Sequence, residues 1–104
     1  MTSIFTKIID REIPADIVFE NDIIVVIKDI NPEAKTHLLI IPKKEIPSVN
    51  DLQESDNDLF LELFSVAKKL AQDLNIAEWY KLFFNVGPKA QDVMHIHLHL
   101  LSDI

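Results

Sequence analysis

The stretch that decides the fold is Met94-His95-Ile96-His97-Leu98-His99-Leu100. It alternates apolar residues with three of the four histidines of the chain. Because successive side chains of a β-strand point to opposite faces of the sheet, this alternation predicts a strand over Val93–Leu101. Its three imidazoles would share one face, and Met94, Ile96, Leu98 and Leu100 would face the core. Three polar rings on one face are costly to bury without hydrogen-bond partners, so the row points to a function.

Two kinds of chemistry suit a row of imidazoles. Neutral imidazole binds transition metals, and a His-x-His pair on a strand can hold zinc, although a third strand position lies too far along to join the same tetrahedral site unaided. Imidazole also attacks phosphorus or carbonyl centres, and its pKa near neutrality suits proton transfer. The residues by themselves leave both interpretations open, with the nucleophile slightly favoured.

Outward from this stretch, apolar spacing and turn residues predict four more strands and two helices. The strands are expected at Ile17–Glu20, Ile23–Lys28, Thr36–Ile41 and Trp79–Asn85. A short helix would be capped by Ser3, carry Ile4, Phe5, Ile8 and Ile9 on one face, and be ended by Pro14. A long amphipathic helix would begin at an N-cap Ser55 and stop at Asn75. Hairpin-connected strands with few helices predict an α+β fold with a five-stranded antiparallel sheet. The long helix would cover one sheet face and leave the other for a ligand or a partner.

Composition narrows the class of protein. The chain has 104 residues, 48% of them hydrophobic, which predicts a single domain over residues 1–104 with a modest core. It contains no cysteine, which excludes disulfides, thiolate metal sites and a cysteine nucleophile. A net charge of −7 argues against nucleic acid or an anionic membrane as the main partner. Short apolar runs and early charges argue against a membrane span or a signal peptide, so we expect a cytoplasmic protein.

The His95–His99 motif, followed by Leu100 and Leu101, resembles the His-x-His-x-His-x-x signature of the histidine-triad (HIT) family, in its HINT-type nucleotide-binding branch. Further blocks of the chain resemble that family in the same order and at similar separations. These blocks are Ser3–Ile9, Glu12–Ala15, Phe19–Asp22, Asp29–Pro32, Thr36–Lys44, Asn85-x-Gly87 and Gln91-x-Val93.

This resemblance implies a homodimer whose two sheets join, formed here through the long helix and the Trp79–Asn85 strand. It implies hydrolysis of purine nucleoside phosphoramidates at the α-phosphate, through a nucleotidyl-histidine intermediate and without a metal or other cofactor. His97 would be the nucleophile, His99 would help hold the phosphate, and His37 and His95 would set tautomers and relay protons.

The resemblance also implies which residues bind the nucleotide. Asp29 would accept hydrogen bonds from the ribose hydroxyls, Asn85 would lie near the phosphate or leaving group, and backbone amides near Val93 could stabilise phosphoryl charge. The base pocket would be lined by Ile8, Ile27 and Ile30. The other residues expected to bind the nucleotide are Gln91, Asp92 and Val93, which precede the motif, and His99, its last residue.

The chain departs from the family pattern at Asp92, where a hydroxyl residue is frequent. A carboxylate there would repel an anionic substrate unless it points away. Two alternatives accompany the phosphoramidase hypothesis. One is a dinucleoside polyphosphate hydrolase, which is the activity of a sister branch of the family. The other, which Asp92 keeps open, is a nucleotide-binding interaction module with little catalysis.

Overall fold

A computed structural model describes residues 2–104. Two α-helices and five strands follow one another with two short 3-10 turns before the second helix. In chain order the elements are α1 Ile4–Ile9, β1 Ile17–Glu20, β2 Ile24–Lys28, β3 Thr36–Pro42, η1 Val49–Asp51, η2 Glu54–Asp56, α2 Asn57–Asp73, β4 Lys81–Phe83 and β5 Leu98–Ser102. Within these residues, no helix has the length and hydrophobicity needed to cross a bilayer.

The five strands form one antiparallel sheet in the order β1-β2-β3-β5-β4, which confirms the predicted α+β class. The register places His99 of β5 directly opposite Leu39 of β3 on one side and Phe83 of β4 on the other. His37 lies two residues before Leu39 and therefore on the same face as His99. The histidine cluster thus forms where the central strands β3 and β5 meet.

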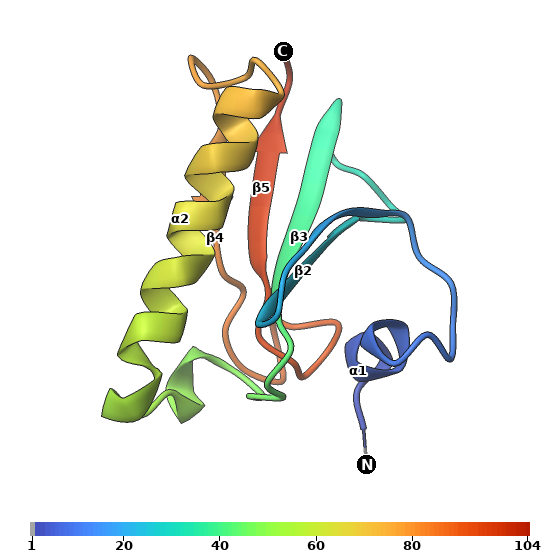
Figure 1. Cartoon of the computed structure of the whole chain (residues 1–104), viewed down its shortest axis with the longest axis vertical. Coiled ribbons are helices and arrows are strands. Elements are labelled where there is room, and N and C mark those ends of the chain that lie inside the picture. Colours follow the sequence, from blue (N-terminus) through green and yellow to red (C-terminus); the bar gives the residue numbers. More distant parts are fainter. Residues whose placement is uncertain (1) are drawn as a thin grey trace.

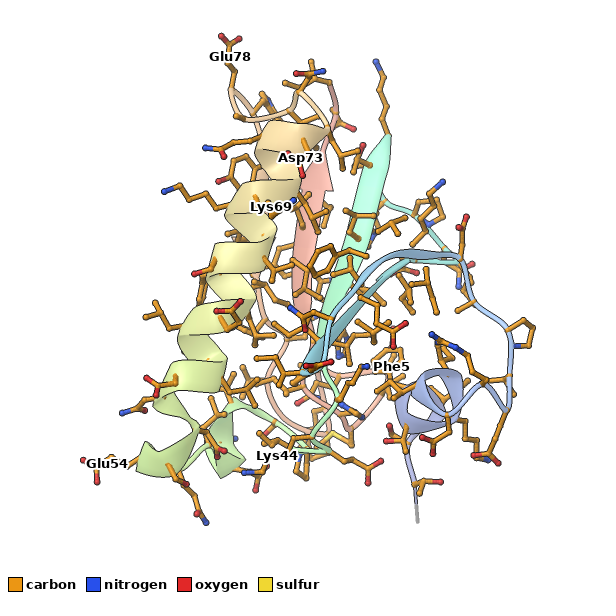
Figure 2. The ribbon with its side chains drawn as sticks, in the orientation of Figure 1. Phe5, Lys44, Glu54, Lys69, Asp73 and Glu78 are labelled. Atoms are coloured by element: carbon orange, nitrogen blue, oxygen red, sulfur yellow. The ribbon has the colours of Figure 1, made fainter. Side chains whose placement is uncertain are left out.

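The two faces of the sheet carry different layers (Figure 1). The helix α2 runs along one face, where its buried residues Leu63, Val66 and Leu70 pack against alternate residues of β2, β3 and β5. The helix α1 lies on the other face, where Phe5 and Ile8 close a second apolar cluster. Figure 2 places Phe5 between α1 and the strands. The histidines lie on the α1 side, the face that the amphipathic pattern left free of the long helix.

The short helix α1 agrees with its predicted start but not with its predicted end. Ser3 does cap α1, accepting the Thr6 N–H at 3.1 Å. The helix ends at Ile9, before Pro14, because the backbone turns at Arg11, which has a φ of 63°. Ile4, expected on the buried face, is 50% exposed.

At the long helix, the predicted cap Ser55 is wrong. The capping position is Asp56, which ends the turn η2 and whose buried carboxylate pairs with Lys44 at 2.6 Å. This contact lies near the N-terminal end of α2 (Figure 2). Asn75 takes the left-handed conformation, with a φ of 59°, as expected for a helix stop.

The predicted C-terminal strands are too long. The strand β4 covers only Lys81–Phe83, and β5 begins at Leu98, not at Val93. The β3–β5 ladder ends at the Ile40–Leu98 pair, close to Pro42, which has no N–H to donate and whose carbonyl accepts a bond from the His95 ring. His95 and His97 therefore lie in irregular backbone, and Met94, predicted to face the core, is 40% exposed.

Candidate active site

His97 is held so that one ring nitrogen is free. Its Nδ1 lies 2.7 Å from the carbonyl oxygen of His95, so Nδ1 carries the hydrogen and donates it. The ring of Phe5 packs edge-on against it, with centroids 5.0 Å apart. Nε2 has no hydrogen-bond partner among residues 2–104, yet no buried side-chain nitrogen in this part of the chain is unpaired, so Nε2 is open to solvent. His97 therefore presents a lone pair, which is the requirement for a nucleophile.

His99 belongs to a hydrogen-bonded chain with two other residues. The Glu33 N–H donates to Nδ1 of His37 at 3.1 Å, so the neutral His37 ring carries its hydrogen on Nε2. That Nε2 lies 2.9 Å from Nδ1 of His99 and 3.4 Å from Oδ2 of Asp29. Donation from His37 to His99 leaves the hydrogen of His99 on its Nε2. His99 therefore presents an N–H donor beside the lone pair of His97.

Asp29, His37 and His99 also offer three potential metal-ligand atoms within 4.8 Å of one another. A metal at this point would need a lone pair on His37 Nε2, and hence a hydrogen on Nδ1. The Glu33 N–H opposes that tautomer, because two donors would then face each other. The hydrogen bonds of this cluster thus favour a chain that holds protons over a transition-metal site.

Burial keeps the rings of His97 and His99 neutral. It lowers the pKa of His97 below the ordinary value of 6.5, against opposing effects of the hydrogen bond to His95 and the charges of Asp29 and Asp92. It lowers the pKa of His99 to about 4, helped by the neighbouring rings of His97 and His37. Both imidazoles are therefore in the free-base form at neutral pH.

A cavity of about 280 Å³ lies between α1 and the sheet and reaches both rings. Its lining combines apolar residues of α1, the turn after it, β2 and β3 with polar residues, among them Asp29, Asp92 and the two histidines. Eight of the predicted site residues line it: Ile8, Ile27, Asp29, Ile30, Asp92, Val93, His97 and His99. Its size is near the lower end of small-ligand pockets, roughly 300–1,000 Å³. A cavity that offers apolar side chains together with a lone pair and an N–H suits a flat ring joined to a phosphoryl group.

Four other predicted residues do not line this cavity. His37 acts on it only through His99, and the side-chain amide of the exposed Asn85 lies 3.5 Å from Nε2 of His99. With the hydrogen of His99 on Nε2, the amide is oriented so that its oxygen accepts that hydrogen. Gln91 is buried and uses its whole side-chain amide inside the protein, on Gly87, Pro47 and Val93.

His95 is fully buried, with Nε2 donating to the carbonyl oxygen of Pro42 at 2.7 Å and Nδ1 2.6 Å from Oγ of Ser3. Since both ring nitrogens have protein partners, His95 has none left for a ligand. The functional roles of His37, His95, Asn85 and Gln91 stay predictions.

Several residues that touch the histidines had no predicted site role, among them Phe5, Phe83, Ser3 and Glu45. Phe83 stacks on His99, with centroids 4.6 Å apart and planes at 4°. Ser3 and Glu45 meet the His95 ring from α1 and from the loop after β3. The strand pairing could have suggested Phe83, which lies directly across from His99, but the sequence contains no signal that would bring Glu45 to His95.

Comparison with known proteins identifies the family to which the chain belongs. The family described as "Scavenger mRNA decapping enzyme C-term binding" matches residues 2–104. A HIT-like protein from Synechocystis is 45% identical over 101 residues, covering 96% of this chain and 89% of the relative. The chain belongs to the histidine-triad family. The purine nucleoside phosphoramidase of Escherichia coli K12 is 46% identical to this histidine-triad protein over 102 residues, covering 96% of this chain and 86% of the enzyme.

Solved structures agree with this assignment. A HIT family hydrolase from Legionella pneumophila superposes on this histidine-triad protein with a TM-score of 0.94 at 48% identity, covering 97% of this chain and 92% of the other. A histidine triad nucleotide-binding protein from Candida albicans gives 0.87 at 32% identity, covering 99% and 76%. The fold and the order of its elements are thus those of the family.

Proposed function

We propose that this protein is a purine nucleoside phosphoramidase, which hydrolyses the bond between the α-phosphate of a nucleotide and an amine. The observation that carries the proposal is the free Nε2 of His97 in a cavity that apolar side chains help to line, with its Nδ1 anchored on the His95 carbonyl. The 46% identity to the E. coli purine nucleoside phosphoramidase supports the same reaction.

In the proposed mechanism Nε2 of His97 attacks the α-phosphorus. A bond forms between this nitrogen and phosphorus while the bond to the leaving nitrogen breaks. That nitrogen takes up a proton from the solvent that reaches the cavity and departs as an amine. The His97 ring becomes positively charged, and its Nδ1–H to the His95 carbonyl holds that charge. Water then cleaves the nucleotidyl-histidine bond, releases the nucleotide and restores the neutral ring.

The other residues would orient the substrate. The Nε2–H of His99 would donate to a phosphoryl oxygen, a position supported by the His37–His99 hydrogen bond of 2.9 Å. Asp29 would accept bonds from the ribose hydroxyls at the cavity wall. Ile8, Ile27 and the 90% exposed Ile30 would cover the faces of the purine, and burial of Ile30 on binding would add affinity.

The reaction is tested with adenosine 5′-phosphoramidate, by following AMP release from the wild type in the presence of a chelator. We expect release to survive the chelator, because His97 supplies the nucleophile. A protein that binds AMP but releases none from this substrate would instead be the interaction module. A much higher kcat/KM on a diadenosine polyphosphate would replace the phosphoramidase with a polyphosphate hydrolase.

The negative charge of Asp92 disfavours the alternative function, hydrolysis of dinucleoside polyphosphates. Its side chain is exposed and lines the same cavity as His97 and His99, and its charge acts on both rings. A carboxylate at this point repels every additional phosphate of a polyphosphate leaving group, whereas an amine leaving group carries no negative charge. The proposed amine substrate thus fits the charge of the cavity better.

For Asp92→Asn we expect tighter AMP binding, because the substitution removes a negative charge beside the phosphate and keeps the size of the side chain. At low salt the dissociation constant should fall about 3- to 10-fold, and by less at high salt because screening weakens the repulsion. Titration calorimetry at two salt concentrations measures this. Asp103→Asn, near the C-terminal end, is the matched control, and equal affinities for wild type and Asp92→Asn would contradict the repulsion.

The pH dependence follows from the lowered pKa of His97. A base with a depressed pKa keeps its lone pair at lower pH, so kcat/KM should stay level as the pH falls through 6.5, the ordinary histidine value. The loss of activity should begin only below it, as His97 becomes protonated. A pH–rate profile measures this, alongside the ¹⁵N shift of the His97 ring. An acid limb centred at or above 6.5 would contradict a buried free-base nucleophile.

We further propose a homodimer that continues the sheet, and a cytoplasmic location. The strand β4 is at one edge of the sheet and pairs only with β5 among the described strands. Phe84 directly follows β4 and stacks on Phe60 of α2, with centroids 5.5 Å apart. Exposed apolar side chains occur at Leu61 of α2 (66%) and at Trp79 (42%), two residues before β4. Such a surface favours association.

Light scattering should give twice the mass of the chain at micromolar concentration. Leu61→Lys places a charge on the proposed interface and should shift the protein toward the monomer. Ile23→Lys, which charges a 45% exposed isoleucine in the β1–β2 hairpin, should leave the mass unchanged. A monomeric wild type would overturn the dimer.

A further inference from the structure

We propose that Glu45 and Ser3 are positioning residues for the nucleophile: they hold His95, and the His95 carbonyl in turn holds the His97 ring. The inference deepens the proposed function and rests on it, because it assigns two residues to the same reaction. Neither residue lies among the histidines of the sequence motif, and Glu45 comes from the loop after β3.

The first contact is between Ser3 and His95. Oγ of Ser3 lies 2.6 Å from Nδ1 of His95, and the His95 Nε2–H donates to the Pro42 carbonyl at 2.7 Å. With Nε2 as the donor, Nδ1 must accept the hydroxyl hydrogen of Ser3. The ring is fully buried, so loss of this hydroxyl leaves a buried nitrogen unpaired. Ser3 therefore fixes both the tautomer and the orientation of His95.

The second contact is between Glu45 and the first turn of α1. Oε1 of Glu45 accepts the backbone N–H of Ser3 at 2.6 Å and the hydroxyl of Thr6 at 2.6 Å, and it lies 4.0 Å from Nδ1 of His95. The N–H of Ser3 lowers the pKa of Glu45 most, followed by the hydroxyl of Thr6, so the carboxylate is charged at neutral pH. Glu45 thus fastens the residue that holds His95.

The third contact carries the effect to the nucleophile. The carbonyl of His95 accepts the Nδ1–H of His97 at 2.7 Å, and the N–H of Ile96, between the two histidines, donates to the carbonyl of Ile46 at 2.7 Å. Ile46 follows Glu45 directly. The loop that carries Glu45 and the segment that carries His97 are therefore bonded both through side chains and through backbone. Displacing His95 would turn the lone pair of His97 away from the phosphorus. Reaction rates are very sensitive to the orientation of the attacking atom.

The test compares Glu45→Leu, Glu45→Gln and wild type. The Leu variant loses both accepted hydrogen bonds, and we expect kcat to fall about 10-fold. The Gln variant still offers an amide oxygen to Ser3 and Thr6, so it should stay within about twofold of wild type, since the bonds and not the charge do the positioning. Glu78→Leu, an exposed glutamate beyond α2 (Figure 2), is the matched control.

Ser3→Ala provides a second variant, and it should lower kcat by a similar factor. Because Ser3 and Glu45 act in one path, the double variant should be little worse than the poorer single one. Independent effects that multiply would overturn a common path.

A readout separate from catalysis is the ¹⁵N spectrum of the His97 ring, in which protonated and free nitrogens differ clearly. In wild type we expect a hydrogen on Nδ1 and none on Nε2, and in Glu45→Leu a mixture. An unchanged spectrum together with unchanged kcat would overturn the proposal. If wild type hydrolyses no phosphoramidate but the spectrum of Glu45→Leu changes, the proposed function is refuted while the positioning path stands.

Discussion

A His97→Asn protein is expected to fold, to bind AMP, and to hydrolyse adenosine 5′-phosphoramidate at a kcat/KM lower by roughly 10⁴-fold or more, as is typical when a nucleophile is lost. Asparagine is chosen because its amide can still donate to the His95 carbonyl, which His97 Nδ1 contacts at 2.7 Å. The change thus removes the attacking nitrogen while keeping the anchor. Steady-state kinetics of AMP release measure the loss.

Binding and folding controls make this result specific. AMP affinity should stay within about threefold of wild type, since the apolar contacts of the base are untouched and such uniform binding is separate from the chemical step. Circular dichroism should match wild type. Substantial turnover by the folded His97→Asn protein would mean that water, or another residue, attacks phosphorus directly.

The largest expected effect on stability is that of Ile24→Ala. Ile24 is fully buried on β2 in the cluster beneath α2, where it pairs with Pro42 of β3. Replacing it removes apolar contacts and leaves a cavity, which costs about 2–5 kcal/mol. Since a domain of this kind is stable by about 5–15 kcal/mol, the loss is a large share of the total. Urea unfolding followed by tryptophan fluorescence measures it.

The neighbouring Ile23 is the matched control, because the same chemical change is made one residue away. Ile23 is 45% exposed, so Ile23→Ala should cost less than about 1 kcal/mol. Equal losses at the two positions would contradict the difference in burial between the first residue of β2 and the turn residue that precedes it.

The elements that sequence reasoning predicted well are those set by local chemistry. The strand β1 has the predicted bounds, and β2 and β3 differ from theirs by one residue. Asn75 ends α2 because asparagine tolerates a positive φ. The apolar face of α2 correctly indicated that the long helix covers one face of the sheet. The other face carries the histidine cavity, but α1 also packs there.

The predicted element bounds are wrong where contacts with residues distant in sequence determine them. The strand β5 is shorter than its alternating pattern because pairing depends on β3, which ends at a proline whose carbonyl is already used by His95. The long helix starts one residue later than predicted, and the residue at its cap, Asp56, forms an ion pair with the distant Lys44. No periodicity in the segment itself reports either contact.

The site was predictable in composition and less so in arrangement. The family resemblance grouped His97 and His99 with Asp29 and three isoleucines, and these residues line one cavity. Their roles in binding stay predictions. Strand alternation placed His95 beside them, but its ring is turned into the protein by Ser3 and Pro42. Tautomers are set by such partners, so the free lone pair of His97 becomes visible only in the structure.

The most direct test of His97 as the nucleophile is the stereochemical course at phosphorus. Hydrolysis of a substrate made chiral at the α-phosphorus with sulfur, in ¹⁸O water, is analysed by ³¹P spectroscopy. Attack by His97 followed by attack by water comprises two in-line displacements, each of which inverts the phosphorus, so the predicted result is net retention. Net inversion would mean a single displacement by water and would contradict a nucleotidyl-histidine intermediate.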